Sequence, residues 1–231
     1  RPVELAWERQ RQFVADASHE LKTPLTVILS NAQLLGEAEG DPALRSRLRE
    51  NILSLSARMR SLVESLLDLA RVDSGLAGQT LSRVDLSRVV SEAILPFEPL
   101  FYERGLVLSS SVEPGIAVKG SAERLSQAVG VLLDNAQKYA SPGGSVSVTL
   151  SRQGGRHCLI AVENSGEPLS PAERRDIFKR FYRADAARSS GGSYGLGLSI
   201  ARGIVEAHRG RIWAEALPGG NRFCIRLRVQ K

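Results

Sequence analysis

His19 is the residue of this 231-residue sequence whose type and setting most clearly allow chemistry. An imidazole is a nucleophile near neutral pH, and a neighbouring carboxylate can raise its basicity. Helical spacing places Asp16 three residues before His19 and Thr23 four residues after it, so both side chains can reach the ring. Glu20 is the next residue and points about 100° away on an ideal helix. The pattern predicts a reactive histidine with acidic and hydroxyl neighbours.

The apolar residues around His19 repeat in steps of three and four, which is typical of an amphipathic helix. The residues of the stripe that we expect to be buried are Val14, Ala17, Leu21, Leu25, Ile28, Ala32 and Leu35. His19 lies off this stripe and should face solvent, although a surface histidine on a coiled coil would fit the same pattern. Pro24 lacks an N–H and crowds the carbonyl of Glu20, so the helix should bend there and bring Glu20 nearer to the ring.

The string Ser-His-Glu-Leu-Lys-Thr-Pro-Leu-Thr, residues 18–26, resembles the H box of sensor histidine kinases of two-component systems. The resemblance implies that His19 accepts phosphate from ATP and passes it to an aspartate on the receiver domain of a response regulator. It also implies that Glu20 is the general base for autophosphorylation. Thr23 matches the family's hydroxyl residue that helps to place a water for dephosphorylating the regulator.

Two long amphipathic stretches make up the first 75 residues. Residues 3–36 are predicted as one helix, and a second helix begins at Pro42 with Asp41 as its N-cap and ends near Gly75. Two such helices joined by a short loop form an antiparallel hairpin that cannot bury its apolar stripe alone. We therefore predict a homodimer in which residues 1–75 form a four-helix bundle. The alternative is that the stripe packs on the second domain of the same chain.

Residues 76–231 alternate between strand and helix patterns, with Asp85 as a helix N-cap. The predicted strands are 80–84, 106–112, 145–150, 157–162, 211–217 and 222–229, and the predicted helices are 86–102, 121–139, 172–181 and 195–207. This order predicts an α/β sandwich with a mixed sheet and helices on one face. Cys158 and Cys224 fall in strands and are expected to be small buried residues, because their number and spacing suit neither a disulfide framework nor a metal site.

Asn135 and Lys138 lie about one turn apart on the predicted helix 121–139. An amide oxygen and an ammonium group suit a magnesium triphosphate, because Mg²⁺ takes few protein ligands when phosphates supply the rest. The segment resembles the N box of the same kinases, which implies that Asn135 coordinates Mg²⁺ and that Lys138 and Tyr139 contact the nucleotide. Val131 departs from the family, which usually has a second Asn at that position.

Residues 163–169 follow a predicted strand and resemble the G1 box, usually Asp-x-Gly-x-Gly. Asn164 stands where the adenine-binding Asp is expected, Gly166 keeps the first glycine, and Pro168 replaces the second. An Asn oxygen can accept the hydrogen bond from the adenine amino group without carrying a charge. We therefore expect adenine selectivity to survive with weaker affinity.

Two further segments carry groups suited to phosphate. Residues 177–183 are similar to the F box, and a planar guanidinium there, Arg180 or Arg183, could reach the terminal phosphate. Residues 191–198 resemble the G2 box, whose glycines let backbone N–H groups approach phosphates at a helix N-terminus. The nucleotide contacts expected in that box are Gly195, Leu196, Gly197 and Leu198. The polar loop 183–194 between the two boxes is expected to act as a lid.

The boxes stand in the family's order and cover nearly the whole chain, so the sequence resembles a sensor histidine kinase with a Bergerat-type ATP-binding domain over residues 76–231. The resemblance implies ATP and Mg²⁺ as cofactors, and a homodimer and a response regulator as partners. It also implies a cytoplasmic location, downstream of a sensor module that this chain lacks. No apolar run reaches the about 20 residues that span a bilayer.

The formal charge of +6 would favour polyphosphate or an acidic protein face. Aromatic residues make up only 5% of the chain and no recognition motif accompanies the charge, so we predict no nucleic-acid partner. Two other functions remain open at this point. One is an ATPase of the gyrase or Hsp90 kind on the same fold, and the other is a degenerate nucleotide-binding scaffold, which the departures at Val131, Asn164 and Pro168 would allow.

Overall fold

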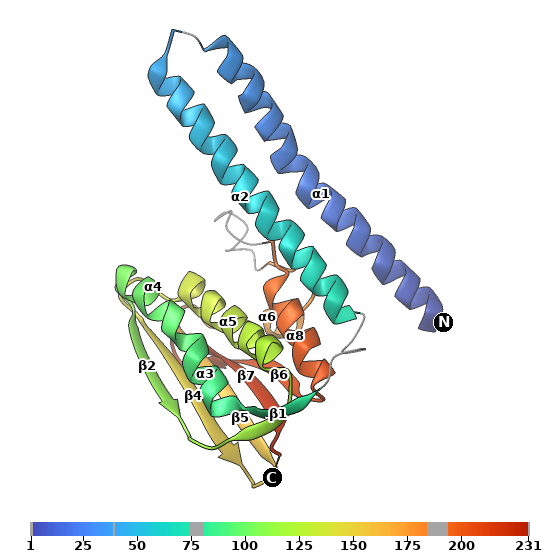
Figure 1. The fold of residues 1–231 in the computed structure, drawn as a ribbon, viewed down its shortest axis with the longest axis vertical. Helices are drawn as coiled ribbons and strands as arrows, with labels where there is room; N and C mark the ends of the chain where they lie inside the picture. Colours follow the sequence, from blue (N-terminus) through green and yellow to red (C-terminus); the bar gives the residue numbers. More distant parts are fainter. Residues whose placement is uncertain (1, 39, 74–80, 184–193, 231) are drawn as a thin grey trace. The chain divides into compact units, whose positions relative to one another are not determined.

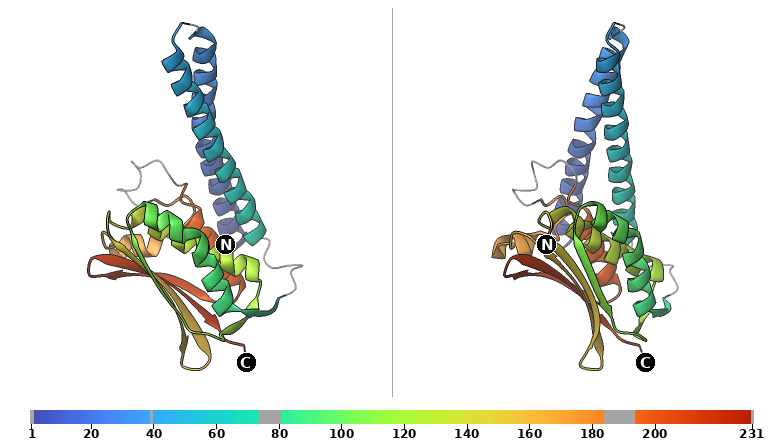
Figure 2. Two further views of the ribbon diagram at one scale, coloured as in Figure 1. Left: turned by 60° about the vertical axis from the view of Figure 1, so that its left-hand side comes forward. Right: turned by 90° about the vertical axis from the view of Figure 1, so that its left-hand side faces the viewer.

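The computed structural model separates into two compact units (Figures 1 and 2). The described residues are 2–38, 40–73, 81–183 and 194–230. The first unit is Arg1–Asp68 together with Gly192–Tyr194, and the rest of the chain forms the second. Among the described helices, none combines the length and the apolar character needed to cross a bilayer.

Two long helices, α1 (Pro2–Glu37) and α2 (Pro42–Asp73), form a hairpin, which confirms the predicted hairpin (Figure 1). The hairpin makes up most of the first unit, and the residues of α2 from Leu69 onward belong to the second. Asp41 caps α2 as expected, because its Oδ1 accepts hydrogen bonds from the backbone N–H groups of Ala43 and Leu44, both at 3.0 Å. The predicted end near Gly75 lies outside the described residues. Pro24 lies inside α1, and the helix continues through it.

The least exposed residues of the hairpin repeat in alternating steps of four and three, as in a coiled-coil seam. On α1 they are Ala17, Leu21, Pro24, Ile28, Asn31 and Leu35, and on α2 they are Leu48, Ile52, Leu55, Met59, Leu62, Leu66 and Leu69. The stripe predicted from the sequence therefore includes most of this seam and further residues that the hairpin alone leaves exposed. Val14 is 53% exposed and Leu25 46% exposed, and Ala32 is exposed as well. The seam passes one residue before Leu25 and Ala32, so the sequence stripe mixed two faces of α1.

The second unit contains a mixed five-stranded sheet in the order β2-β4-β5-β7-β6. The strands are β2 (Val107–Val112), β4 (Ser145–Gln153), β5 (His157–Ser165), β6 (Arg211–Leu217) and β7 (Gly220–Arg228). Strands β2 and β4 run parallel and the other neighbours antiparallel, which confirms the predicted mixed sheet. A two-stranded sheet of β1 (Ser82–Asp85) and β3 (Ala117–Gly120) also forms, and β3 was not predicted.

Three helices cover one face of this sheet (Figure 2). They are α3 (Leu86–Ile94), α5 (Ala122–Tyr139) and α8 (Gly197–Ala207). The core between helices and sheet consists of fully buried apolar side chains, among them Leu125, Leu132, Leu133, Val148, Ile160 and Phe223. Cys158 and Cys224 are buried and free, as predicted, and burial raises the pKa of the two thiols to about 11 and about 12.

Two predicted helices are shorter in the structure. The segment predicted as 86–102 divides into α3, a 3₁₀ turn at Leu95–Phe97 and α4 (Glu98–Glu103), because a proline near the start of each later piece cannot donate to the preceding turn. The segment predicted as 172–181 is helical only in α6 (Pro171–Asp176). Phe181 has a positive φ of 58°, which a helix cannot contain.

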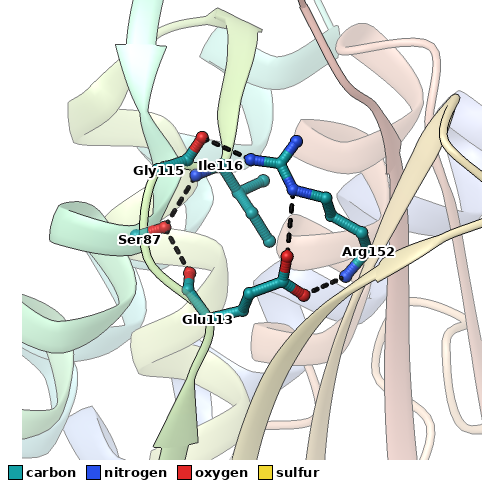
Figure 3. Close-up of polar contacts among 5 residues, drawn as sticks. All are labelled: Ser87, Glu113, Gly115, Ile116 and Arg152. Atoms are coloured by element: carbon teal, nitrogen blue, oxygen red, sulfur yellow. Dashed lines mark hydrogen bonds and ion pairs between the residues drawn. The ribbon is translucent and has the colours of Figure 1, made fainter.

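A polar network fixes the turn between β2 and β3 (Figure 3). The Ser87 hydroxyl donates to the Glu113 carbonyl at 2.7 Å and accepts from the Ile116 N–H at 3.0 Å. The backbone N–H and Nε of Arg152 donate to the two carboxylate oxygens of Glu113, at 2.8 and 2.9 Å. The Arg152 Nη2 donates to the Gly115 carbonyl at 2.7 Å. The network ties α3 and β4 to this turn, and none of its residues was expected to bind nucleotide.

Candidate functional site

His19 is exposed on α1, as the sequence predicts. The Thr23 hydroxyl donates to the His19 backbone carbonyl at 3.3 Å rather than to its ring. Asp16 accepts a hydrogen bond from Gln12 Nε2 at 2.7 Å, so it is engaged along the helix. Within the described residues, no hydrogen bond or ion pair engages the side chain of His19 or of Glu20. The imidazole is therefore presented to solvent on a rigid helix, where a docked group can reach it.

Helix α5 carries the candidate metal ligand and two candidate nucleotide contacts. Asn135 is 9% exposed, and no other described residue forms a hydrogen bond with its side chain. Lys138 Nζ forms an ion pair with Asp134 Oδ2 at 2.5 Å, one turn earlier on the same helix. Tyr139 is exposed at the C-terminal end of α5. The Asn135 amide oxygen is thus available, whereas Lys138 must leave Asp134 to contact a phosphate.

Asn164 lies near the end of β5, and its side chain includes a buried hydrogen-bond acceptor. Its side chain is 3% exposed, and Nδ2 donates to the Ser165 carbonyl at 3.0 Å. Because a carbonyl oxygen can only accept, this bond fixes the orientation of the amide. Oδ1 is then buried with no hydrogen-bond partner among the described residues. Leaving such an acceptor unsatisfied costs about 1–3 kcal/mol, so the position fits a ligand that brings a donor, such as an amino group.

Gly166 brings the end of β5 against the end of α5. It has a φ of 152°, and a Cβ there would lie 2.7 Å from the Tyr139 carbonyl oxygen. Its N–H donates to the Gly219 carbonyl at 2.9 Å. A larger residue would separate the two elements, so Gly166 keeps Asn164 close to the end of α5.

Asn221 holds the turn that follows Gly166, and sequence reasoning missed it. Its Oδ1 accepts from the Leu169 N–H and its Nδ2 donates to the Glu167 carbonyl, both at 2.8 Å. Asn221 lies opposite Asn164 in the register of β5 and β7. Only that strand pairing could have revealed its role, because the two residues are far apart in the sequence.

The G2 residues form the start of α8. Gly195 has a φ of 70°, and a Cβ there would collide with the Tyr182 carbonyl. Leu196 occupies the N-cap position and supplies no side-chain cap, so the first N–H groups of α8, at Gly197 and Leu198, are not satisfied by a capping side chain. Such an uncapped helix start can bind an anion.

Val131 packs beside this helix start. A Cβ on Gly197 would lie 3.3 Å from Val131 Cγ1, so α5 and α8 touch at the position where the family usually has a second Asn. The second unit therefore places Asn164 and Gly166 at the end of α5 and the G2 residues along its side. His19, Glu20 and Thr23 belong to the other unit.

The F-box arginines lie after α6. Arg180 Nη2 forms an ion pair with Asp73 Oδ1 at 2.5 Å, and Arg183 is half-buried. Phe178 is buried and meets Phe223 edge-on, with ring centroids 6.5 Å apart, which anchors this segment on the sheet. Most of the expected lid, residues 184–193, lies outside the described residues.

Comparison with known proteins bears on both units. Residues 9–75 match the family model "His Kinase A (phospho-acceptor) domain". Residues 120–231 match "Histidine kinase-, DNA gyrase B-, and HSP90-like ATPase". The solved structure of the mycobacterial sensor histidine kinase MprB is 31% identical with a TM-score of 0.58, covering 64% of this chain and 99% of that chain. The chain belongs to the sensor histidine kinases.

Two further relatives of this histidine kinase are informative. The histidine-protein kinase/phosphatase MprB of Mycolicibacterium smegmatis is 40% identical over 221 residues, which is 93% of this chain and 44% of that protein. The solved complex of histidine kinase ThkA with response regulator TrrA has a TM-score of 0.76 at 20% identity, covering 99% of this chain and 66% of that chain, and it shows likeness of fold.

These matches confirm the predicted fold class and family. The histidine kinase chain has a helical hairpin followed by an α/β sandwich, and its second unit contains the family's ATP-binding domain. The match of the ATP-binding domain alone would also fit an ATPase of the gyrase or Hsp90 kind. The additional match to the phospho-acceptor domain identifies the chain as a histidine kinase instead. The chain spans about half the length of the curated relatives it matches.

Proposed function

We propose that this chain is an ATP-dependent histidine autokinase that phosphorylates His19 and passes the phosphoryl group to an aspartate of a response regulator. The observation that carries the proposal is the exposed His19 ring, unengaged among the described residues, inside the segment matched by the phospho-acceptor domain. A nucleophile that must meet both a nucleotide and a partner protein needs such exposure.

The reaction has two displacements at one phosphorus. A ring nitrogen of His19 attacks the γ-phosphorus of ATP, the N–P bond forms as the P–O bond to ADP breaks, and Glu20 accepts the ring proton. An aspartate oxygen of the receiver domain then attacks the same phosphorus, the N–P bond breaks, and the ring takes a proton back. Positioning of the reacting atoms supplies most of the rate.

Dephosphorylation of the regulator is a further proposed activity. Thr23 has the position at which its hydroxyl could help to place the water that attacks the aspartyl phosphate. The relative from Mycolicibacterium smegmatis is named a kinase/phosphatase, which supports a double activity here.

The nucleotide site that we propose lies in the second unit, around the buried Asn164 Oδ1 and the start of α8, which no side chain caps. Asn164 Oδ1 accepts from the adenine amino group, and Gly166 with Tyr139 borders the base. Gly195, Leu196, Gly197 and Leu198 offer backbone N–H groups to the phosphates at the start of α8.

Cations complete the site in this proposal. Lys138 exchanges Asp134 for a phosphate oxygen, which costs little because an ion pair this exposed is weak. Either Arg180, after leaving Asp73, or Arg183 contacts the terminal phosphate. Asn135 fits Mg²⁺ through its unengaged amide oxygen, with phosphate oxygens and waters as the other ligands. When bound, the metal offsets charge on the β- and γ-phosphates.

We further propose a homodimer in which residues 1–75 form a four-helix bundle and residues 76–231 are the catalytic domain. Apolar side chains outside the hairpin seam support it, and they include Val14, Leu25, Leu29, Leu53, Val63 and Leu67, all more than 40% exposed. A second copy can cover them. We also propose that a sensor module lies upstream and that this part is cytoplasmic; the curated relatives are longer than this chain, and one of them is named a sensor protein.

Labelled ATP tests the proposed activity. The wild-type chain should gain acid-labile phosphate with Mg²⁺ and γ-labelled ATP, and His19→Gln should gain none. His157→Gln, at an exposed histidine on β5, is the matched control and should label like the wild type. Acid-stable label, or label on His19→Gln, would show a different phosphoacceptor.

A further inference from the structure

The sheet face opposite the helices carries three arginines and a histidine that lie close together. Within the second unit, no described helix covers this face (Figure 2). Strand register places Arg211 of β6 directly opposite Arg226 of β7, and His157 of β5 directly opposite Arg228 of β7. All four side chains are exposed. We call these four residues the basic cluster.

No described carboxylate of the second unit forms an ion pair with an arginine of the basic cluster, that is, with Arg211, Arg226 or Arg228. Like charges directly opposite each other on neighbouring strands destabilise a sheet. Arg211 lies on the edge strand, where charge protects against sheet-to-sheet pairing, but β7 is an inner strand. Edge protection therefore does not explain Arg226 and Arg228.

The guanidinium of Arg211, a member of the basic cluster, is held in place by a neighbouring aromatic ring. The guanidinium carbon of Arg211 lies 5.6 Å from the centroid of the Trp213 ring. The indole is itself fixed, because its Nε1 donates to Glu215 Oε1 at 2.7 Å. A guanidinium stacked on a ring keeps the N–H groups along its edge available for a carboxylate.

The other end of the same face has the opposite charge balance. Arg222 Nε contacts Glu163 Oε1 at 2.8 Å, and its Nη1 contacts Glu215 Oε2 at 3.4 Å. Two carboxylates thus share one guanidinium there. The face is basic at one end and acidic at the other, along the same three strands.

We infer that this face docks an acidic segment of a protein partner, with carboxylates on the basic cluster and a cationic group beside Glu163 and Glu215. A membrane surface or a nucleic acid would bring negative charge to both ends of the face and would be repelled at the acidic one. A protein segment can place both signs in register. The inference concerns a surface outside the proposed nucleotide site and does not depend on phosphoryl transfer.

The test compares two triple variants with equal loss of charge. One is R211Q/R226Q/R228Q, in the basic cluster, and the matched control is R83Q/R88Q/R202Q, at exposed arginines on β1, α3 and α8. Binding of a hexaglutamate peptide to the ¹⁵N-labelled chain is followed by NMR at low salt. The wild type and the control should show saturable shifts of the Trp213 indole N–H and of the β6 and β7 amides. The cluster variant should bind at least about tenfold more weakly.

Two results would overturn the inference. Equal weakening in both triple variants would mean that net charge alone attracts the peptide. Stronger, cluster-dependent binding of phosphatidylserine vesicles or of a DNA duplex would assign the face to a membrane or a nucleic acid. ADP binding is measured in the same samples, because its retention in both variants shows that the second unit is folded and separates this test from that of the nucleotide site.

Discussion

At the residue scale, Asn164 offers a neutral amide at the position where the family usually has a carboxylate. Its Nδ2 donates a hydrogen bond to the Ser165 carbonyl, and its buried Oδ1 has no hydrogen-bond donor among the described residues. Asn164→Ala should weaken ADP binding about tenfold, because a lost hydrogen bond of about 1.4 kcal/mol has that effect on an equilibrium constant. Asn164→Asp keeps an acceptor and should retain binding. Titration calorimetry with Asn51→Ala, at an exposed residue of α2, as control checks this. Unchanged affinity in Asn164→Ala would place the base elsewhere.

We predict that Thr23 acts in only one of the two proposed activities. Its hydroxyl donates to the helix backbone rather than to the His19 ring. Thr23→Ala should therefore spare autophosphorylation and slow dephosphorylation of the regulator several-fold. Thr26→Ala is the matched control, because its hydroxyl makes the same kind of bond, to the Lys22 carbonyl at 3.0 Å. Equal loss of both activities in Thr23→Ala would contradict the separation of roles.

Residues whose role depends on near neighbours could be predicted from the sequence. The exposure of His19 followed from helical period, and the caps at Asp41 and Asp85 followed from residue type before a helix. Asn221 could not be predicted, because its function depends on which strand lies beside β5. The ion pair of Arg180 with Asp73 joins residues from distant segments and was missed for the same reason.

At the element scale, His208 connects the two helices that carry most of the proposed nucleotide site. Its Nε2 accepts from the N–H of Ser121, the N-cap of α5, at 3.0 Å. Its Nδ1 lies 2.7 Å from the Ile204 carbonyl on α8, so the neutral ring with a proton on Nδ1 satisfies both contacts. A protonated ring would lose the acceptor for Ser121.

Burial lowers the pKa of His208, so the folded state binds fewer protons there than the unfolded state. The stabilisation is therefore complete above the unfolded pKa of about 6.5, and it is lost as the pH falls below that value and through the lower pKa of the folded state. The free energy of unfolding, measured with urea, should be smaller at pH about 5.5 than at about 7.5. In His208→Gln this difference should be smaller than in the wild type, because the ring that titrates is gone. An unchanged slope in His208→Gln would contradict the assignment.

Element spans were predictable where one period dominates, as in α1, α2 and α5. The face that α1 turns toward α2 was harder, because Val14 and Leu25 form a second apolar face beside the seam. The prediction of one helix to residue 102 did not take account of the prolines that divide it. Strand β3 is too short for its residues to show an alternating pattern.

At the scale of the whole molecule, the proposed kinase activity needs two units with separate tasks. One presents His19, and the other holds the groups suited to ATP. Their compact cores were predictable from alternating patterns, whereas the choice between phosphorylation within one chain and across a dimer was not, because it depends on how the hairpin loop turns.

The central claim is that the phosphoryl group from ATP ends on His19. The most direct measurement is tandem mass spectrometry at neutral pH after incubation with Mg-ATP and trypsin digestion. We expect phosphate on the peptide 12–22, at His19 rather than at the adjacent Ser18, and none in Asn135→Ala, whose α5 would lack the proposed metal ligand. Phosphate on Ser18 or outside this peptide would show that His19 is not the phosphoacceptor.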